Sequence, residues 1–483
     1  MQRIFITEAV GKVGEQVLLK GWVHVRRNMG KMVFIDLRDR TGLMQVVIAP
    51  ANVEEASVAA AKAMRPEFVV AVTGTVQRRK SGSENPKLAT GTVEVLASKV
   101  EIISEAKTPP FEIDNEERQA AEELRLKYRY LDLRHERLQK NLTLRHEVIL
   151  FMRKYLAERG FREIETPILS KSTPEGARDY LVPSRLYHGK FYALPQSPQQ
   201  YKQLLMVAGI ERYFQIARCF RDEDTRGDRQ PEFTQLDLEM SFVEREDVMA
   251  LNEELLVSIV KTLAPEKRIQ QVPFPRLSYK EAMEKYGTDR PDLREDKNDP
   301  NLLAFVWIID FPFFEKTDDP STIRQAHGGD QGRTTGSGWT FTHNPFSAPK
   351  PEFVEDLLAR QNIGGILTSQ YDVVLNGWEI GGGSIRNHRA DALQAVFEIM
   401  GHKLEDIKHN FGHMLEAFSY GVPPHGGIAW GMDRLFMVLA GEPNIREVIA
   451  FPKTADAKDL LMGAPDVVTD EQMADLGLQY RGE

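Results

Sequence analysis

The sequence has a single cysteine, Cys219, among 483 residues. One thiol can form neither an internal disulfide nor a cysteine-based zinc site, so a disulfide-stapled secreted fold is not expected. No window reaches eighteen uninterrupted apolar residues, which argues against a membrane span or membrane partner. The first ten residues lack the basic, apolar and small-residue order of a secretory signal. We therefore expect a cytoplasmic protein.

Common nucleotide-binding motifs are absent too. No Gly-Lys pair is followed by Ser or Thr, and no GxGxxG, HExxH or GxSxG pattern occurs. The eleven histidines do not cluster at metal-site spacing. If the chain binds a nucleotide, it does so with a fold other than a P-loop or Rossmann domain.

What is present is enough chain for two or three compact units, with 42% apolar and 28% charged residues. The net charge of −9 is uneven. Residues 1–105 carry 15 Lys and Arg against 11 Asp and Glu, a balance of +4, which leaves −13 for the rest. A mildly basic N-terminal unit is compatible with a nucleic acid contacting part of the surface, although scattered surface charge often gives the same balance.

The first hundred residues predict a five-stranded OB-fold barrel. A helix separates the third and fourth strands, as in that fold, and the strands are expected at 17–25, 31–39, 42–49, 68–77 and 91–103. In the second strand, Phe34 alternates with the apolar positions and falls on the charged face. An aromatic there suits base stacking, or it caps the barrel's edge.

The rest of the chain begins with a polar segment, residues 106–135, which predicts a linker and a hinge helix. A long amphipathic helix should run from 136 to a C-cap at Gly160. Residues 161–184 predict a strand ending at Pro167 and a loop containing Glu175 and Arg178.

Residues 213–242 predict an antiparallel hairpin with a polar loop. Ala217, Cys219, Arg221 and Glu223 should share one face of the first strand, and Gln235, Asp237 and Glu239 one face of the second. Small residues beside Arg221 leave room for a ligand over a charged surface. The alternative is a solvated lattice of salt bridges, each worth about 0–1 kcal/mol.

A second hairpin is predicted at Asn376-Gly377, the strongest short turn signal. It pairs Val374 with Glu379 and places Asp372 and Glu379 on the same face. Two converging carboxylates either repel each other or hold a divalent cation, and hard oxygen ligands suit Mg²⁺ bridging phosphates. Arg434 follows a glycine-rich strand in the first turn of a helix, where backbone amides favour an anion.

Together these segments resemble the class II aminoacyl-tRNA synthetases, and specifically the bacterial aspartyl-tRNA synthetases. Pro167 matches motif 1, FRDED with the RQPEFTQ return matches motif 2, and GMDR matches motif 3. The resemblance implies an α+β multidomain protein. Its expected parts are an OB-fold anticodon-binding domain (1–105), a linker or hinge (106–135) and a catalytic domain built on an antiparallel sheet flanked by helices (136–483).

The resemblance also implies the reaction. The carboxylate of L-aspartate attacks the α-phosphate of ATP, and the aspartyl-adenylate is transferred to the 3′ end of tRNA-Asp. A carboxylate with a pKa near 4 needs no general base, so positioning and charge neutralisation suffice. The implied catalytic residues are Arg221, Glu223 and Arg434. The implied ATP-binding residues are Arg221, Asp222, Glu223, Gln230, Glu379, Gly431, Met432, Asp433 and Arg434. Asp372 and Glu379 would hold Mg²⁺.

The implied aspartate-binding residues are Glu175, Gln199, Lys202, Arg221, Asp237, His343 and Arg386. A second carboxylate is costly to bury unless cations meet it, and Lys202 and Arg386 are the cations in place. Asparaginyl relatives usually lack the lysine, so aspartate is the expected substrate. The family usually has a second histidine where Asn344 stands.

The implied anticodon-reading residues are Arg27, Phe34, Gln45 and Glu94, and this context favours the stacking role of Phe34. One alternative is a relaxed enzyme that also charges tRNA-Asn. Family members that charge tRNA-Asp alone and those that charge both differ partly in the residues near 29–31, and this sequence matches neither residue set cleanly there. A second alternative is a non-catalytic RNA-binding protein, whose signature would be loss of Arg221, Arg434 or a metal ligand. A homodimer is expected because motif 1 lies at the interface throughout the class.

Two departures are expected. Bacterial members of the family usually carry an extra domain inserted in the catalytic domain. We expect this insertion to be absent here, because only a short polar joint stands at 294–300. A Gly-rich stretch at 327–339 has no match and is interpreted as a mobile loop beside the active site.

Overall fold

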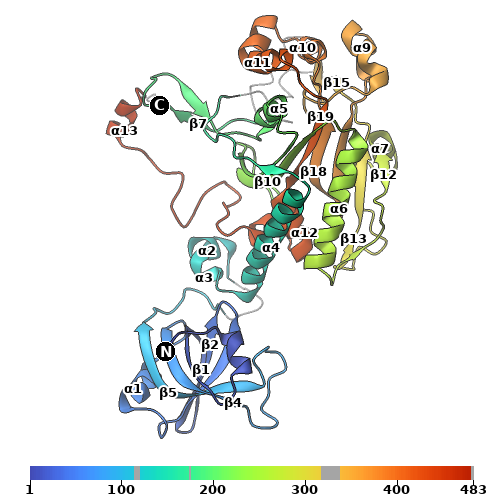
Figure 1. The fold of residues 1–483 in the computed structure, drawn as a ribbon. Coiled ribbons are helices and arrows are strands. Elements are labelled where there is room, and N and C mark those ends of the chain that lie inside the picture. The colour runs from blue at the N-terminus through green and yellow to red at the C-terminus, as the bar shows by residue number, and fades with distance from the viewer. Residues whose placement is uncertain (114–119, 173–175, 317–337, 480–483) are drawn as a thin grey trace. The chain divides into compact units, whose positions relative to one another are not determined.

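The structure, a computed structural model, describes residues 1–113, 120–172, 176–316 and 338–479. The chain divides into two compact units, Met1–Gln139 and Lys140–Glu483 (Figure 1). The predicted Gly-rich loop falls almost entirely outside the described residues, as does Glu175.

The first unit contains the predicted OB-fold, which is confirmed. Five strands close a barrel in the order β1-β2-β3-β5-β4, with α1 (Glu55–Ala63) between the third and fourth. The strands are β1 (Gln16–Met29), β2 (Met32–Asp39), β3 (Gly42–Ile48), β4 (Val69–Arg78) and β5 (Val93–Ser104). Ile35 and Leu37 of β2 are fully buried in the barrel core. Phe34 and Asp36, which alternate with them, lie half-buried on the outer face.

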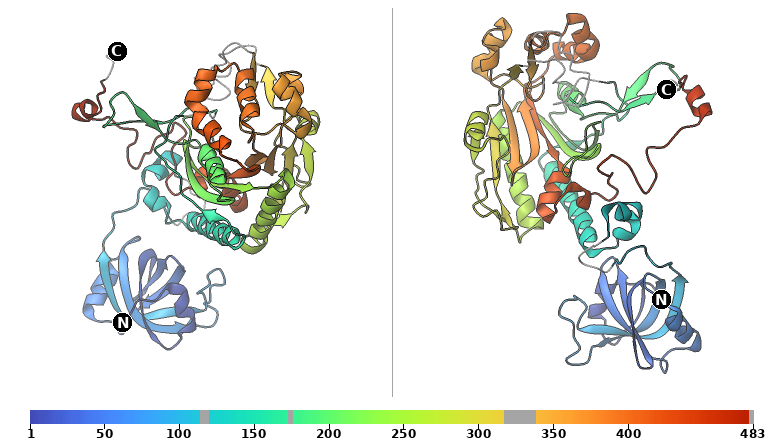
Figure 2. Two further views of the ribbon diagram at one scale, coloured as in Figure 1. Left: turned by 45° about the horizontal axis from the view of Figure 1, so that its top comes forward. Right: turned by 180° about the vertical axis from the view of Figure 1, so that it is seen from behind.

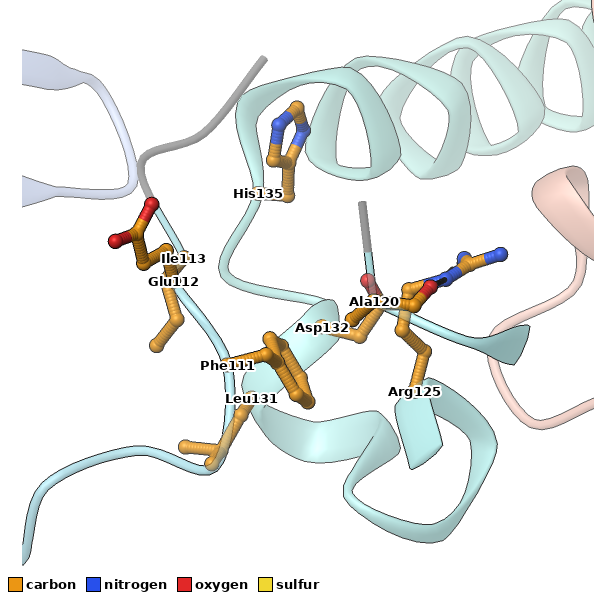
Figure 3. A pocket seen from close by; sticks show the side chains of 8 residues that line it. All are labelled: Phe111, Glu112, Ile113, Ala120, Arg125, Leu131, Asp132 and His135. Atoms are coloured by element: carbon orange, nitrogen blue, oxygen red, sulfur yellow. Dashed lines mark hydrogen bonds and ion pairs between the residues drawn. The ribbon is translucent and has the colours of Figure 1, made fainter. Parts of the chain in front are cut away.

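Two short helices, α2 (Glu122–Lys127) and α3 (Arg129–Asp132), follow in the same unit. The Arg129–Asp132 ion pair at 2.6 Å is buried. Arg134 attaches this segment to the barrel, because its guanidinium pairs with Glu67 at 2.6 Å and lies over the Trp22 ring. A small pocket opens between these helices and the preceding strand-like segment (Figure 3).

Helix α4 (Glu136–Glu158) ends as predicted. Gly160 has a φ of +79°, the left-handed conformation of a C-cap glycine. The predicted strand to Pro167 is shorter than expected. Its ladder pairing with β9 is limited to β6 (Arg162–Glu163), after which the chain leaves the sheet and Ser170 pairs with Ala193.

The second unit is built on an eight-stranded sheet in the order β12-β14-β17-β18-β19-β10-β9-β6. Its six central strands are antiparallel, as predicted, whereas the edge strands β6 and β12 run parallel to their neighbours. The strands are β9 (Arg212–Phe220), β10 (Glu232–Ser241), β12 (Arg276–Ser278), β14 (Phe305–Ile309), β17 (Gln370–Leu375), β18 (Trp378–Ile385) and β19 (His425–Gly431).

One face of this sheet is covered by α4, α6 (Arg245–Leu263) and α12 (Met432–Ala440), with which it forms the largest hydrophobic core (Figure 2). Leu236 and Leu238 of β10 and Trp430 of β19 point into this core. The alternate residues of the same strands therefore face the other way, and they are polar or small.

Smaller elements surround the sheet. The helices are α5 (Gln199–Val207), α7 (Tyr279–Tyr286), α9 (Val354–Ala359), α10 (Ala390–Ile399), α11 (Leu404–Ser419) and α13 (Asp470–Asp475). The short strands are β7 (Leu181–Pro183), β8 (Phe191–Ala193), β11 (Arg268–Ile269), β13 (Leu302–Leu303), β15 (Phe314–Lys316) and β16 (Trp339–Phe341). Within the described ranges, no helix combines the length and apolarity needed to cross a bilayer.

Candidate active site

The polar face of the large sheet is organised in rows, because directly paired residues of antiparallel strands point the same way. One row consists of Asp237, Ala429, Gly382 and Asp372, and the next of Glu239, Gly427, Ser384 and Gln370. Charged residues therefore stand at both ends of a face whose centre has small ones.

Glycine is required in the centre of this face. A Cβ on Gly382 would lie 2.8 Å from Asp372 Oδ1, and one on Gly427 would lie 2.2 Å from Glu239 Oε2. Both distances are too short for a side chain to fit without displacing a carboxylate. The middle of the face consequently carries only glycines and the small side chains of Ala429 and Ser384, which leaves room for a ligand between the two charged ends.

At one end, Lys202, Asp237, Glu239 and Arg386 form a buried group that we call the charge cluster. Lys202 Nζ, from α5, lies 3.0 Å from Asp237 Oδ2 and 3.4 Å from Glu239 Oε2. The Arg386 guanidinium donates two hydrogen bonds to Glu239, at 2.8 and 3.0 Å, and a third to Ser384 Oγ at 2.8 Å. All four residues are at most 2% exposed. The hairpin faces and the two cations predicted from the sequence thus come together at one place.

The two carboxylates of the charge cluster differ in electrostatics. Burial raises the pKa of Asp237 above its ordinary value, and the single nearby Lys202 ammonium does not offset it. Burial also opposes ionisation of Glu239, but the Arg386 guanidinium and Lys202 outweigh burial and hold its pKa below the ordinary value. Glu239 is therefore a fixed structural anion, whereas Asp237 has unused capacity to accept from a cation.

Three buried polar atoms here have no hydrogen-bond partner among the described residues: Gln199 Nε2, Arg221 Nε and Asp237 Oδ1. Arg221 continues the β9–β10 ladder on the polar face through its N–H to Pro231 O at 2.8 Å, and its guanidinium lies over the Phe233 ring. Two donors and one acceptor are left for a ligand. A carboxylate and an ammonium, the two groups of an amino acid, complement that set.

At the other end, Asp372 and Glu379 form what we call the carboxylate pair. The predicted Asn376-Gly377 turn is confirmed, with Val374 opposite Glu379 in the register. A bulge at Val373/Val374 keeps Asp372 and Glu379 on one face. Oxygens of both lie within 4 Å of the position of a Cβ on Gly382. Burial, followed by repulsion from Glu379, raises the pKa of Asp372 well above its ordinary value.

In the described part of the chain, no Lys or Arg forms an ion pair with the carboxylates of this pair, and the Gln370 amide donates to Asp372 Oδ1 at 3.2 Å. Among the described residues, no group of three or more His, Cys, Asp or Glu is arranged to hold a metal. A cation bound by the pair would therefore take its remaining ligands from outside the protein. The donor set suits Mg²⁺.

The predicted triphosphate-binding residues lie beside the pair, with different surroundings. Arg434 donates to Glu379 O at 2.9 Å and pairs with Asp228 at 3.1 Å, so it connects the β17–β18 hairpin to the loop after β9. Glu223, in that loop, pairs with Arg229 at 3.4 Å. Asp222 is held by backbone bonds to Arg178.

Three other predicted ATP residues have side chains committed elsewhere. The Gln230 amide exchanges hydrogen bonds with the backbone of Lys453, at 3.2 and 2.7 Å. Met432 is buried in the core, and Asp433 is paired with Arg145 of α4. Gly431 precedes α12 as its N-cap, without a side chain of its own.

His343 contacts the Phe311 ring edge-on at 4.7 Å. Asn344, which stands where a second histidine was expected, accepts from Phe346 N and Ser347 Oγ and so closes a turn. Glu175 lies outside the described residues.

The predicted anticodon residues are neighbours on the outer face of the barrel. Arg27 pairs in register with Phe34 and forms an ion pair with Asp36 at 2.9 Å, and Asp36 lies opposite Gln45. Gln45 donates to Glu94 at 2.7 Å. Phe34 is absent from the barrel's core cluster, which favours the stacking role over the structural one.

Two residues were missing from the sequence-based site set. Glu239 and Ser384 belong to the polar face and hold Arg386 and Lys202 in place. Strand alternation already put Glu239 beside Asp237, so the signal for it was present. Ser384 is two residues before Arg386 on the predicted strand, so alternation placed both on the same face.

Comparison with known proteins agrees with this geometry. The family described as tRNA synthetases class II (D, K and N) matches residues 121–455, and the OB-fold nucleic acid binding domain matches residues 17–103. An aspartate–tRNA(Asp/Asn) ligase of Dehalococcoides mccartyi (strain CBDB1) is 41% identical over 604 aligned residues, spanning 98% of each chain. An aspartate–tRNA ligase of Staphylococcus saprophyticus is also 41% identical, spanning 99% of this chain and 98% of its own.

Among solved structures, asparaginyl-tRNA synthetase from Pyrococcus horikoshii complexed with asparaginyl-adenylate has a TM-score of 0.73. It is 24% identical and covers 94% of this chain and 98% of its own, a likeness that concerns the fold.

Proposed function

Because this chain belongs to the class II aminoacyl-tRNA synthetases of the D, K and N group, we propose that it is an aspartate–tRNA ligase. It activates L-aspartate with ATP and transfers the aspartyl group to the 3′ end of tRNA-Asp. The observation that carries the choice of amino acid is the charge cluster, in which Lys202 and Arg386 are buried side by side on the polar face.

The charge cluster and the unpaired atoms together fit a dianionic amino acid. The ammonium of the substrate is placed against Asp237 Oδ1, and its side-chain carboxylate against Lys202 and Arg386. Each cation has donors beyond those that Asp237 and Glu239 accept. The reacting carboxylate then lies toward Arg221 and Gln199. It is already ionised at neutral pH, so the chain's contribution is to orient it for in-line attack and to neutralise charge.

Arg221 and Arg434 would meet the phosphates of ATP, Arg221 at the α-phosphate and Arg434 at the terminal end. Magnesium, when bound, would be held by Asp372 and Glu379 and would neutralise charge on the phosphates. The raised pKa of Asp372 supports this role, because a buried carboxylate facing a second, partly buried one is a poor arrangement without a cation.

The OB-fold supports tRNA as the second substrate. We propose that residues 1–105 read the anticodon, with a base stacked on Phe34 and polar contacts from Arg27, Gln45 and Glu94. The relatives' names include both tRNA-Asp and tRNA-Asp/Asn ligases, so relaxed charging of tRNA-Asn is the second candidate.

A homodimer and a shortened catalytic domain complete the proposal. Exposed apolar side chains on and after α4 support dimerisation, with Leu150 58%, Ile168 47% and Leu169 55% exposed. The alignment with the Dehalococcoides mccartyi ligase has 604 positions, 121 more than this chain has residues. At least 121 residues of that relative therefore have no counterpart in this chain. We place the missing insertion at 294–300, where the Gln270 side chain closes a tight joint by bonding Leu293 O and Glu295 N.

The activity is tested with purified full-length protein. Aspartate-dependent pyrophosphate exchange and aspartylation of tRNA-Asp are expected, and charging of tRNA-Asn in parallel decides between the strict and relaxed forms. Arg221→Ala should abolish most exchange while leaving tRNA affinity nearly intact, because the guanidinium acts on the phosphate. Exchange at the parent rate would remove Arg221 from the site, and no exchange by the parent would favour the non-catalytic RNA-binding alternative.

The anticodon assignment has its own test. Phe34→Ala should raise the KM for tRNA by roughly five- to a hundredfold, because stacking is worth about 1–3 kcal/mol per base. The KM for aspartate should not change. Equal effects on both constants would contradict the assignment.

A further inference from the structure

Both carboxylate oxygens of Asp433 accept hydrogen bonds from other parts of the protein. One oxygen accepts from Arg145 of α4, and the other accepts from Thr234 N of β10 at 3.2 Å. Asp433 is 4% exposed. These contacts connect the first turn of α12 to α4 and β10.

Arg145 reaches three further groups. Its guanidinium donates to Thr234 Oγ1 at 3.0 Å and to Val448 O at 3.3 Å, and it lies 4.9 Å from the centre of the Phe436 ring. It thus joins α4 to β10 and to α12. Four residues earlier on α4, Asn141 donates to Glu442 Oε1 and to Glu447 O, at 2.7 and 3.1 Å.

The residue after Asp433 is Arg434, whose guanidinium contacts Glu379 O and Asp228. Consecutive helical residues are rigidly related, so an anchor at Asp433 fixes the rotation of the first turn of α12. It thereby fixes where the Arg434 guanidinium lies. The charge cluster shares β10 with these contacts, but its ion pairs are made by Lys202 of α5 and by Arg386, which follows β18, and by neither Arg145 nor Asp433.

We propose that Arg145 is a positioning residue for the ATP half of the site: through Asp433 it orients α12 so that Arg434 meets the terminal phosphates. The inference rests on the proposed function. It means that α4, through Arg145, affects the affinity for ATP but not the affinity for aspartate.

The test measures pyrophosphate exchange with the full-length chain, varying ATP at saturating aspartate and aspartate at saturating ATP. Arg145→Ala should raise the KM for ATP about ten- to a hundredfold, because a displacement of about 1 Å in a positioning group has effects of that size. The KM for aspartate should stay within about twofold of the parent. Arg145→Lys, which keeps a cation beside Asp433, should recover part of the loss.

Two controls lie on the same helix. Arg153→Ala removes an exposed guanidinium paired with Glu163 and should leave both constants unchanged. Leu156→Ala removes a fully buried core side chain and should lower the melting temperature without separating the two KM values.

A rise in both KM values together in Arg145→Ala, or the same ATP effect in Leu156→Ala, would overturn the inference and leave Arg145 a general stabiliser. If Arg145→Ala folds poorly, the same comparison of the two KM values is made with Arg145→Lys. The double variant Arg145→Lys, Thr234→Val provides a further test: if it folds and its KM for ATP equals that of the parent, the inference is also overturned. A parent protein without exchange would instead refute the proposed function.

Discussion

The two charged ends of the polar sheet face are built on opposite principles. In the charge cluster, two cations and two carboxylates balance each other, and each cation directs at least one donor at a carboxylate. In the carboxylate pair, two acids face each other beside a bare glycine. The first end is organised before any ligand arrives, whereas the second is complete only with a cation. The difference separates recognition of an amino acid from binding of a metal with its phosphates.

The pKa values express the same contrast. Arg386 and Lys202 outweigh burial and lower the pKa of Glu239, so this acid stays ionised inside the protein. Asp372 is equally buried but has Glu379 as its charged neighbour, and its pKa rises. Burial is common to Glu239 and Asp372, so the neighbouring charges set the direction for these two acids, whereas Lys202 and Arg386 do not offset the burial of Asp237.

The largest effect is expected from breaking the balanced end. Arg386→Ala leaves Glu239 buried without the guanidinium that donates two hydrogen bonds to it. The loss should lower the free energy of unfolding by about 3–5 kcal/mol and abolish aspartate-dependent pyrophosphate exchange. Thermal unfolding and exchange assays measure both. The control is Arg389→Ala, an exposed pair with Asp391 that should change stability by about 0–1 kcal/mol. Similar melting temperatures for the two variants would contradict a buried, balanced cluster.

A smaller effect, a gain in stability rather than a loss, is expected from removing a charge at the carboxylate pair. In the folded protein, Asp372 retains its proton at pH values where the unfolded chain has lost it, because its folded pKa lies above 3.8. Its contribution to stability is therefore complete below about pH 3.8 and is lost as the pH rises through the raised pKa. Glu379→Gln removes the repulsive charge, so its melting temperature without magnesium should fall less over that rise than the parent's.

Added Mg²⁺ supplies the check on this prediction. It should raise the melting temperature of the parent at neutral pH and that of Glu379→Gln much less, because the variant has one anionic ligand fewer. Parallel pH curves for the two proteins, with no response to magnesium in either, would mean that the carboxylate pair is not a cation site.

The smallest effect sharpens the comparison without altering any charge. Ser384→Ala removes one hydrogen bond to Arg386 and should lower stability by about 0.5–1.5 kcal/mol. The KM for aspartate should rise by severalfold while the KM for ATP is unchanged, since Ser384 supports the amino-acid end alone. A selective change in the KM for ATP would show that the two ends are not separable.

Local chemistry explains why much of this arrangement was predictable from the sequence. Asn376-Gly377 fixed the register that brings Glu379 beside Asp372, and strand alternation placed Arg221 and Asp237 on one face. The resemblance to a family added Lys202 and Arg386, which no periodicity would have joined. The bulge at Val373/Val374 was not predictable, since it has no distinctive residue pattern.

Contacts between distant segments could not be predicted from the sequence. Gln230 and Lys453 are 223 residues apart, and Arg145 and Asp433 are 288 apart. A motif identifies such residues but does not say which neighbour satisfies them in the fold. The sequence therefore did not predict that the side chains of Gln230 and Asp433, both expected to bind ATP, also join distant parts of the protein.

The glycines at 382 and 427 limit how this enzyme can change. At these two positions the floor offers nothing that substitution can adjust gradually, because any larger residue strikes an acid that the site depends on. New substrate preferences must therefore arise at the walls, on α5 and at the strand ends, while the floor stays as it is.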